Sequence, residues 1–228
     1  SSDSLEHYVS KGQNVGGLWG APSGWIIDVD LDWDESVEAA KVLLPKTFIY
    51  GRHSRPRSHY LYRCEGVSGR KWRDEDSVIV ELRSTGAQSV LPPSIHPDNE
   101  RYEINDDLPF KSVTPSSLER SLDHVAAASL LARRYPEEGG RHDFIHTVAG
   151  TLLHRGWENP LVRKFMRAML NAVGDRESDR PQRERTIENT LRLFKEGGNV
   201  AGYTTLTQWL KGKDFEAIRK WIDPRGAP

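Results

Sequence analysis

The sequence predicts an α+β fold, with a mixed α and β first half and an all-helical second half. Short apolar segments typical of strands dominate residues 1–112. Beyond them, apolar residues recur every three or four positions, which is typical of amphipathic helices. Acidic residues and two prolines interrupt both patterns between residues 105 and 115. We therefore expect two domains, residues 1–112 and residues 113–228.

Four segments of the first half are predicted strands, and one is a predicted helix. Residues 34–44 begin with acids, place Val37 and Ala40 at helical spacing and stop at Pro45, so a helix is expected there. The predicted strands are the acid-containing 25–30, the aromatic and alternating 58–64, the β-branched 78–83, and 89–91, which two prolines end.

The second half contains at least four predicted helices. The first begins at Thr114-Pro115-Ser116, a combination typical of a helix N-terminus, and continues through the apolar positions of 118–129. The same spacing recurs in 145–152, 162–169 and 187–194. Glycines separate these segments, so we expect a helix bundle.

Composition excludes several classes of protein. No apolar run approaches the roughly 20 residues of a membrane span, so we expect a cytoplasmic protein with no membrane partner. The single cysteine, Cys64, excludes a disulfide framework and multi-cysteine zinc sites. The net charge of −1 is unevenly distributed, because residues 1–114 carry −5 and residues 115–228 carry +4. This distribution suggests an acidic site in the first half and a mildly basic surface in the second.

Asp28 and Asp30 are the first candidates for chemistry. Residues two apart on a strand share a face, so both carboxylates project together while Ile27 and Val29 face the core. Neighbouring carboxylates repel unless a cation lies between them, and oxygen ligands suit Mg²⁺ or Mn²⁺. An acidic strand end that runs into the turn 32–34 explains the pair equally well.

His59 and Glu81 extend this candidate site. If their strands lie beside 25–30, both side chains converge with the two aspartates on one sheet face. Three carboxylates beside a basic patch are what two-metal nucleotidyl transfer requires. Taken alone, an edge-strand histidine and a solvent-facing glutamate are the slightly favoured interpretation.

Basic and small residues surround these positions. The segment 52–58 carries three arginines that are candidates for phosphate binding. The segment 83–86, Arg-Ser-Thr-Gly, directly follows the Glu81 region and would let backbone N–H groups approach an anion. A solvated loop and a plain turn explain the two segments equally well.

Five pieces of the chain then occur in one order. They are SGWIIDVD at 23–30, SHYLY at 58–62, VELRSTG at 80–86, VLPPSIHP at 90–97, and Tyr102. In this order and spacing they resemble the primase-polymerase (prim-pol) branch of the archaeo-eukaryotic primase superfamily, found in plasmids, phages and integrated elements. The resemblance covers roughly residues 14–104, and the Pro-Pro-Ser-Ile-His-Pro string after the acidic strand is its most specific part.

The resemblance implies a bent, mostly antiparallel sheet and a DNA primase-polymerase that makes or extends primers on single-stranded DNA. Its substrates would be nucleoside triphosphates, a template and a primer, and a helicase would lie outside this chain. The implied catalytic residues are Asp28, Asp30, Glu81 and His59, the first three as ligands of two Mg²⁺ or Mn²⁺ ions. Glu81 stands where many relatives have aspartate, which lengthens its reach. The implied nucleotide-binding residues are Ser58, His59, Arg55, Arg57, Arg63, Arg83, Ser84, Ser94 and His96.

The second half resembles, less specifically, the helix bundle that follows such domains and helps to bind template and starting nucleotide. Candidate contacts to DNA phosphates are Arg141, His142, Arg180, Arg183 and Arg185. For any single arginine of this set, a solvated helix end is the better interpretation.

Two other functions stay open. His142 and His146, with Asp143 between them, approach the helical His-Glu-x-x-His pattern of a metal-dependent protease or phosphohydrolase, although no third ligand follows at a known spacing. Alternatively, the chain is a non-catalytic module for single-stranded DNA or a replication origin, on which Tyr60, Tyr62 and Trp72 stack bases. The retained cluster of acids argues against that module.

Overall fold

The computed structural model describes residues 14–137, 139–174 and 178–223. It confirms the α+β class and divides the chain into two compact units that are interleaved in sequence. The first unit contains the chain up to Asp34, Pro45–Trp72 and Val80–Glu119. The second contains Glu35–Leu44, Arg73–Ile79 and the chain from Arg120. The boundary predicted at residue 112 therefore falls within the last segment of the first unit.

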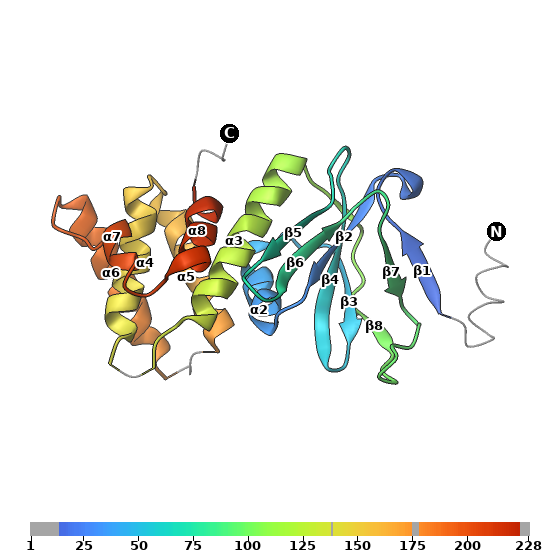
Figure 1. The fold of residues 1–228 in the computed structure, drawn as a ribbon, viewed down its shortest axis with the longest axis horizontal. Coiled ribbons are helices and arrows are strands. Elements are labelled where there is room, and N and C mark those ends of the chain that lie inside the picture. Colours follow the sequence, from blue (N-terminus) through green and yellow to red (C-terminus); the bar gives the residue numbers. More distant parts are fainter. Residues whose placement is uncertain (1–13, 138, 175–177, 224–228) are drawn as a thin grey trace. The chain divides into compact units, whose positions relative to one another are not determined.

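The first unit is built on a mainly antiparallel sheet of seven strands (Figure 1). Their spatial order is β5 (Arg70–Arg73), β6 (Val78–Arg83), β2 (Ile26–Leu31), β4 (Arg55–Arg63), β3 (Phe48–Arg52) and β8 (Tyr102–Asp106), with β9 (Lys111–Ser112) parallel to β4. A separate antiparallel pair contains β1 (Val15–Leu18) and β7 (Gln88–Leu91), and η1 (Ala21–Ser23) is a single 3₁₀ turn. The predicted strands correspond to β2, β4, β6 and β7, whereas the other five strands were not predicted.

Strand β2 has an apolar face and an acidic face. Ile27, Val29 and Leu31 are completely buried, which stabilises the strand through the hydrophobic effect. Asp28 and Asp30 alternate with them and are also buried, with exposures of 0% and 7%. Buried carboxylates need ionic or hydrogen-bonding partners, so the strands on either side of β2 must supply them.

A tight hairpin joins β3 to β4. A Cβ atom on Gly51 would lie 2.5 Å from the carbonyl oxygen of Arg55, so only glycine allows the two backbones to approach this closely. The pairing register also shifts between Tyr50 and Arg52. This close turn brings Arg52 and Arg55, from opposite strands of the hairpin, to face each other.

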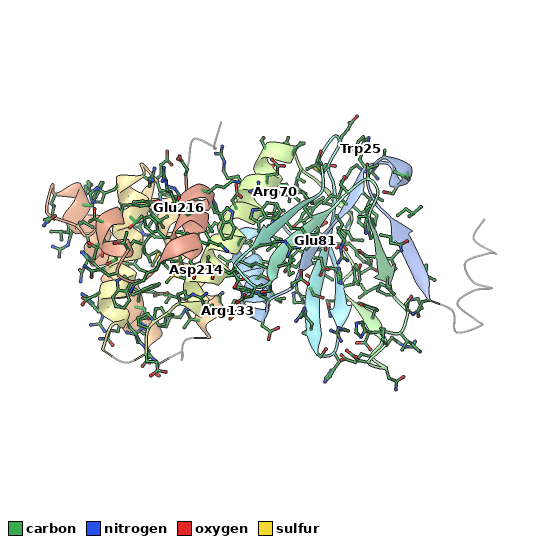
Figure 2. The ribbon with its side chains drawn as sticks, in the orientation of Figure 1. Trp25, Arg70, Glu81, Arg133, Asp214 and Glu216 are labelled. Carbon is green, nitrogen blue, oxygen red and sulfur yellow. The ribbon has the colours of Figure 1, made fainter. Side chains whose placement is uncertain are left out.

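The second unit is helical. It contains α2 (Asp34–Leu43) from its second residue onward, α3 (Pro115–Arg133) from Arg120, and α4 (Arg141–His154), α5 (Asn159–Val173), α6 (Arg180–Lys195), α7 (Tyr203–Leu206) and α8 (Gly212–Trp221). Helix α4 packs against α5, α6 and α7. Two ion pairs join separate segments at 2.7 Å, Arg133 with Glu35 and Arg134 with Asp214; Figure 2 labels Arg133 and Asp214. None of the described helices has both the length and the apolar character of a membrane span.

His124 on α3 makes the second unit sensitive to acid. Its ring lies 4.4 Å from the Trp157 ring and 6.2 Å from the Phe165 ring. Burial, together with the charges of Arg120 and Lys164, lowers its pKa from 6.5 to about 4. The unfolded chain therefore binds more protons between these pH values, and the free energy of unfolding should fall by roughly 3 kcal/mol as the pH drops through them.

Urea denaturation at pH 7 and pH 4 measures this effect. His124→Leu should weaken the pH dependence, whereas His53→Gln, at an exposed position, should leave it intact. An unchanged pH dependence in His124→Leu would contradict the assignment.

Candidate active site

The sheet register brings the predicted catalytic residues together. Asp30 on β2 is the cross-strand partner of both His59 on β4 and Glu81 on β6. Directly paired residues point to the same face, so these three side chains converge around the central strand. Asp28, two residues earlier on β2, shares that face and pairs with Arg83 on β6.

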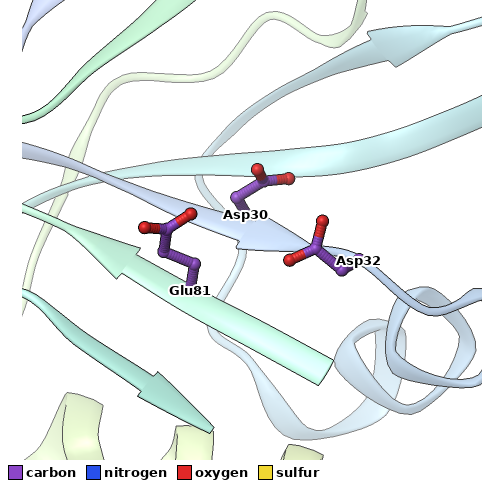
Figure 3. A group of neighbouring side chains, drawn as sticks. All are labelled: Asp30, Asp32 and Glu81. Atoms are coloured by element: carbon purple, nitrogen blue, oxygen red, sulfur yellow. The ribbon is translucent and has the colours of Figure 1, made fainter. Parts of the chain in front are cut away.

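Three carboxylates form a group that could hold a cation (Figure 3). Oxygen atoms of Asp30, Asp32 and Glu81 lie within 4.8 Å of one another. Mg²⁺ binds carboxylate oxygens at about 2.1 Å, so two oxygens on opposite sides of an ion lie about 4.2 Å apart. This separation is a little less than the 4.8 Å limit of the group. The donor chemistry and spacing therefore fit a divalent cation. Asp32 was predicted only as part of a turn, although it continues the two-residue spacing of Asp28 and Asp30.

Asp28 lies outside that group and contacts other polar side chains. Its carboxylate lies 3.1 Å from Nδ1 of His59 and accepts a 2.5 Å hydrogen bond from Oγ of Ser89. A guanidinium nitrogen of Arg83 is 3.8 Å away. Ser89 also accepts hydrogen bonds from the Trp19 indole and from Arg83, so it ties the β1–β7 pair to the acidic face of the sheet.

His59 is buried, and its pKa is raised. Its ring stacks on that of Tyr50, with centroids 4.4 Å apart and planes 7° from parallel. Burial alone lowers its pKa, but the charge and hydrogen bond of Asp28 and the charge of Asp30 outweigh burial and raise the pKa above 6.5. When His59 is protonated, its Nδ1–H donates to Asp28 and its Nε2–H is available to another acceptor.

Arg83 and Lys71 balance the acids. Nη2 of Arg83 lies 2.5 Å from Asp30 and 3.0 Å from Glu81, and Nζ of Lys71 lies 2.8 Å from Glu81. Burial raises the pKa of Glu81, but hydrogen bonds from Lys71 and the charge of Arg83 reverse this and hold it below its usual value. Burial dominates at Asp30 and raises its pKa to about 6, despite the opposing charges of His59 and Arg83.

Asp30, Asp32, Glu81, His59 and Arg83 line a cavity of about 650 Å³. This volume falls within the range of small-molecule sites. Of the predicted site residues, the cavity is lined by Asp30, Arg55, Ser58, His59, Glu81, Arg83 and His96. Arg52, from the basic segment 52–58, also lines it, as do Ser89 and Tyr102, for which no site role was predicted.

Four predicted nucleotide-binding residues do not line the cavity. Arg57 pairs with Asp106, and the guanidinium of Arg63 donates to the Gly24 carbonyl at 2.6 Å. Ser84 donates to the Val67 carbonyl at 2.7 Å, and Ser94 accepts from the Val15 amide at 2.8 Å. The polar groups of these side chains already have partners within the protein. The side chains therefore hold neighbouring segments in place.

Arg52 and His96 form one wall of the cavity. Nη1 of Arg52 lies 3.3 Å from Nδ1 of His96, 3.1 Å from Asp98 and 3.3 Å from Glu100. The amide of Asp98 also donates to Nδ1 of His96 at 3.2 Å. Nδ1 of His96 also lies 3.1 Å from the Asp98 carboxylate, so Arg52, His96 and Asp98 form one polar cluster at this wall.

The second unit gives a mixed outcome for the predicted DNA-binding set. Arg185 is exposed on α6, whereas Arg183 is only 8% exposed, so little of the Arg183 side chain is accessible. Arg180 donates to the Asn171 amide oxygen, and Arg141 lies over the Tyr135 ring at 5.9 Å. The periodicity of α6 explains why Arg183 is buried, because Arg183 shares a helix face with the buried Ile187 four residues later.

The histidine-centred metal site is not supported. Nδ1 of His142 lies 3.1 Å from Thr186 Oγ1, and Nδ1 of His146 lies 2.9 Å from Thr190 Oγ1. Both histidines thus join α4 to α6. Within the described residues, the only group with suitable metal-ligand spacing is Asp30, Asp32 and Glu81.

Comparison with known proteins agrees with this site. The family model of the N-terminal domain of bifunctional DNA primase/polymerases (Prim-Pol) matches residues 5–118, which is half of the chain. No curated protein and no solved structure matches it. The matched segment contains every residue of the acidic cavity, and the chain belongs to the Prim-Pol family of bifunctional DNA primases/polymerases.

Proposed function

We propose that this chain is a template-directed nucleotidyltransferase that makes or extends primers on single-stranded DNA. A 3′-hydroxyl oxygen forms a bond to the α-phosphorus of a nucleoside triphosphate, the bond to the pyrophosphate oxygen breaks, and the hydroxyl proton is released. The observation that carries the proposal is the convergence of Asp30, Asp32 and Glu81 with His59 in one cavity. We further propose that its setting is the replication of a plasmid, phage or integrated element, with helicase activity supplied outside this chain.

The acids are the proposed cation ligands. Asp28, Asp30 and Glu81 would hold two Mg²⁺ or Mn²⁺ ions, and we include Asp32 because its carboxylate lies close to those of Asp30 and Glu81. When bound, such ions neutralise the triphosphate and lower the pKa of the attacking hydroxyl. Asp28 has a second proposed role, because its contact with Nδ1 fixes the orientation of the His59 ring.

The basic residues of the cavity are the proposed triphosphate ligands. Nε2–H of the His59 imidazolium donates to a phosphate oxygen, while Tyr50 holds the ring from one side. Arg52 and Arg55 line the same cavity and supply positive charge. Ser58 and His96 line the same cavity and add smaller polar groups.

Template binding by the second unit is a separate proposal. Arg141, His142, Arg180 and Arg185 would contact DNA phosphates, with Arg185 the most exposed candidate on α6. Arg185→Glu should weaken binding of a short single-stranded oligonucleotide by about threefold to tenfold and reduce the dependence of log Kd on log salt by about one. Fluorescence anisotropy across a salt series measures both quantities.

The control for this prediction is Arg219→Glu. Arg219 is an exposed arginine of α8 that pairs with Glu216 and was not predicted to bind DNA. If both variants weaken binding equally, charge alone explains the loss and the assignment to α6 is wrong.

A synthesis assay on single-stranded template tests the proposed function. All nucleotides and Mg²⁺ or Mn²⁺ are supplied, with and without a primer, beside a double variant Asp28→Ala/Asp30→Ala. Products that depend on metal and are lost in the double variant establish a polymerase, and products without primer establish a primase. Intact DNA binding without synthesis under any condition would instead favour the non-catalytic binding module.

A further inference from the structure

Arg83 lies among the carboxylates that are proposed to bind cations. Its Nη2 is 2.5 Å from Asp30 and 3.0 Å from Glu81, its Nη1 is 3.8 Å from Asp28, and its Nε donates to Glu81 at 3.1 Å. It therefore contacts all three carboxylates predicted as metal ligands from the sequence.

This position conflicts with a bound divalent ion. Carboxylate oxygens that accept from a guanidinium have fewer lone pairs available for a metal, and the positive charge repels a second cation. Lys71 adds to the conflict at Glu81, but its side chain is 46% exposed, so its contact is weaker. The side chain of Arg83 is only 22% exposed and makes the larger contribution.

Arg83 has space to move without disturbing the sheet. It lines the cavity of about 650 Å³, which also contains His59 and Arg55. Its backbone is fixed by pairing with Asp28 on β2, and the adjacent Leu82 is 1% exposed in the core. Only the side chain, which has a long flexible stem, would need to change its conformation.

We propose that Arg83 is an internal counter-cation that divalent ions displace, and that the displaced guanidinium then binds the triphosphate. This inference rests on the proposed function, because it assumes the cation and nucleotide sites of that function. In the metal-free protein Arg83 neutralises the buried acids, and on loading it exchanges carboxylate partners for phosphate oxygens. Cation and nucleotide binding then become positively coupled, since each removes an obstacle to the other.

The test measures binding, without turnover, on the full chain. Mn²⁺ binding is followed by electron paramagnetic resonance, and a non-hydrolysable nucleoside triphosphate is titrated separately. Arg83→Met keeps the length of the side chain and removes its charge. It should bind Mn²⁺ alone about tenfold more tightly and the nucleotide several-fold more weakly than the unaltered chain. Damage to the fold would weaken the binding of both Mn²⁺ and nucleotide. Opposite changes in the two affinities therefore distinguish the proposal from a structural role.

Arg63→Met is the matched control. Arg63 lies on β4, and its guanidinium donates to the Gly24 carbonyl. It should leave Mn²⁺ affinity unchanged. Lys71→Met should increase Mn²⁺ affinity less than Arg83→Met does, because Lys71 contacts one carboxylate of the set and is more exposed.

The outcomes separate this inference from the proposed function. If the unaltered chain binds Mn²⁺ and Arg83→Met binds it no more tightly, the displacement is wrong while the cation site stands. If neither protein binds Mn²⁺, the cation site itself is wrong and the inference falls with it. If only Arg83→Met binds Mn²⁺, divalent ions do not displace Arg83 in the unaltered chain, and the proposal is overturned although the acids can hold a cation.

A second measurement does not depend on the folding of Arg83→Met. In the ¹⁵N side-chain spectrum of arginine-labelled protein, the Nε–H signal of Arg83 is identified by its absence from Arg83→Lys. Mg²⁺ should shift this signal while the Arg63 signal stays in place. An Arg83 signal that does not respond to saturating Mg²⁺ would overturn the proposal.

Discussion

Asp30→Asn is expected to abolish nucleotide incorporation, with a fall in kcat of at least about 10³-fold. Asp30 belongs to the acidic group and is the cross-strand partner of both His59 and Glu81. The amide keeps the size of the side chain but removes a charge from the centre of the site. Primer extension under single-turnover conditions measures the loss, and circular dichroism establishes that the fold is retained.

Asp76→Asn is the control for Asp30→Asn. Asp76 is exposed between β5 and β6, and the same substitution there should leave incorporation unchanged. Asp32→Asn should give a smaller loss than Asp30→Asn, since Asp32 lies at the end of the acidic group and is half-buried. Normal incorporation by Asp30→Asn would refute the assignment of the cation site.

His59→Gln is expected to lower kcat/KM by about 10²-fold and to change its dependence on pH. The folded pKa of His59 is raised, so the imidazolium forms below that pKa and is lost as the pH rises through it. The unaltered enzyme should therefore lose activity on the alkaline side of pH 6.5, above the raised pKa. In His59→Gln, that alkaline fall should be absent. Rates of single-nucleotide incorporation across a pH series measure both effects.

The raised pKa of His59 also makes the stability of the fold depend on pH. The pair with Asp28 stabilises the folded state fully below the unfolded pKa of His59, and this contribution disappears as the pH rises through the folded pKa. His53→Gln changes a nearby exposed histidine and should preserve both the rate and its pH profile. An alkaline fall that persists in His59→Gln would assign the titration to another group.

The acidic site was largely predictable because it depends on strand periodicity. Residues two apart share a face, and this rule alone pairs Asp28 with Asp30 and Glu81 with Arg83. The adjacency of β2, β4 and β6 was an assumption that the register confirms. The same periodicity includes Asp32, but the following Trp33-Asp34 favoured a turn, and so Asp32 was missed.

Long-range contacts explain the other differences between the prediction from sequence and the structure. Arg57 and Arg63 lie in a basic segment, but their partners, Asp106 and the Gly24 carbonyl, are far away in sequence. Ser89 contacts Asp28 across 61 residues, and no local pattern marks such a contact. Short strands such as β5 and β9 carry too few residues for alternation to predict them.

The interleaving of the two units limits how this chain can be divided or recombined. Glu35 is ion-paired with Arg133, and the Leu43 carbonyl accepts from Lys164, so α2 depends on helices encoded much later in the chain. A gene fragment that stops after residue 112 would separate α2 from these partners. A single crossover at that point would join α2 of one relative to the later helices of another. Relatives should therefore inherit residues 1–112 and 113–228 together, with matched substitutions where α2 contacts the later helices.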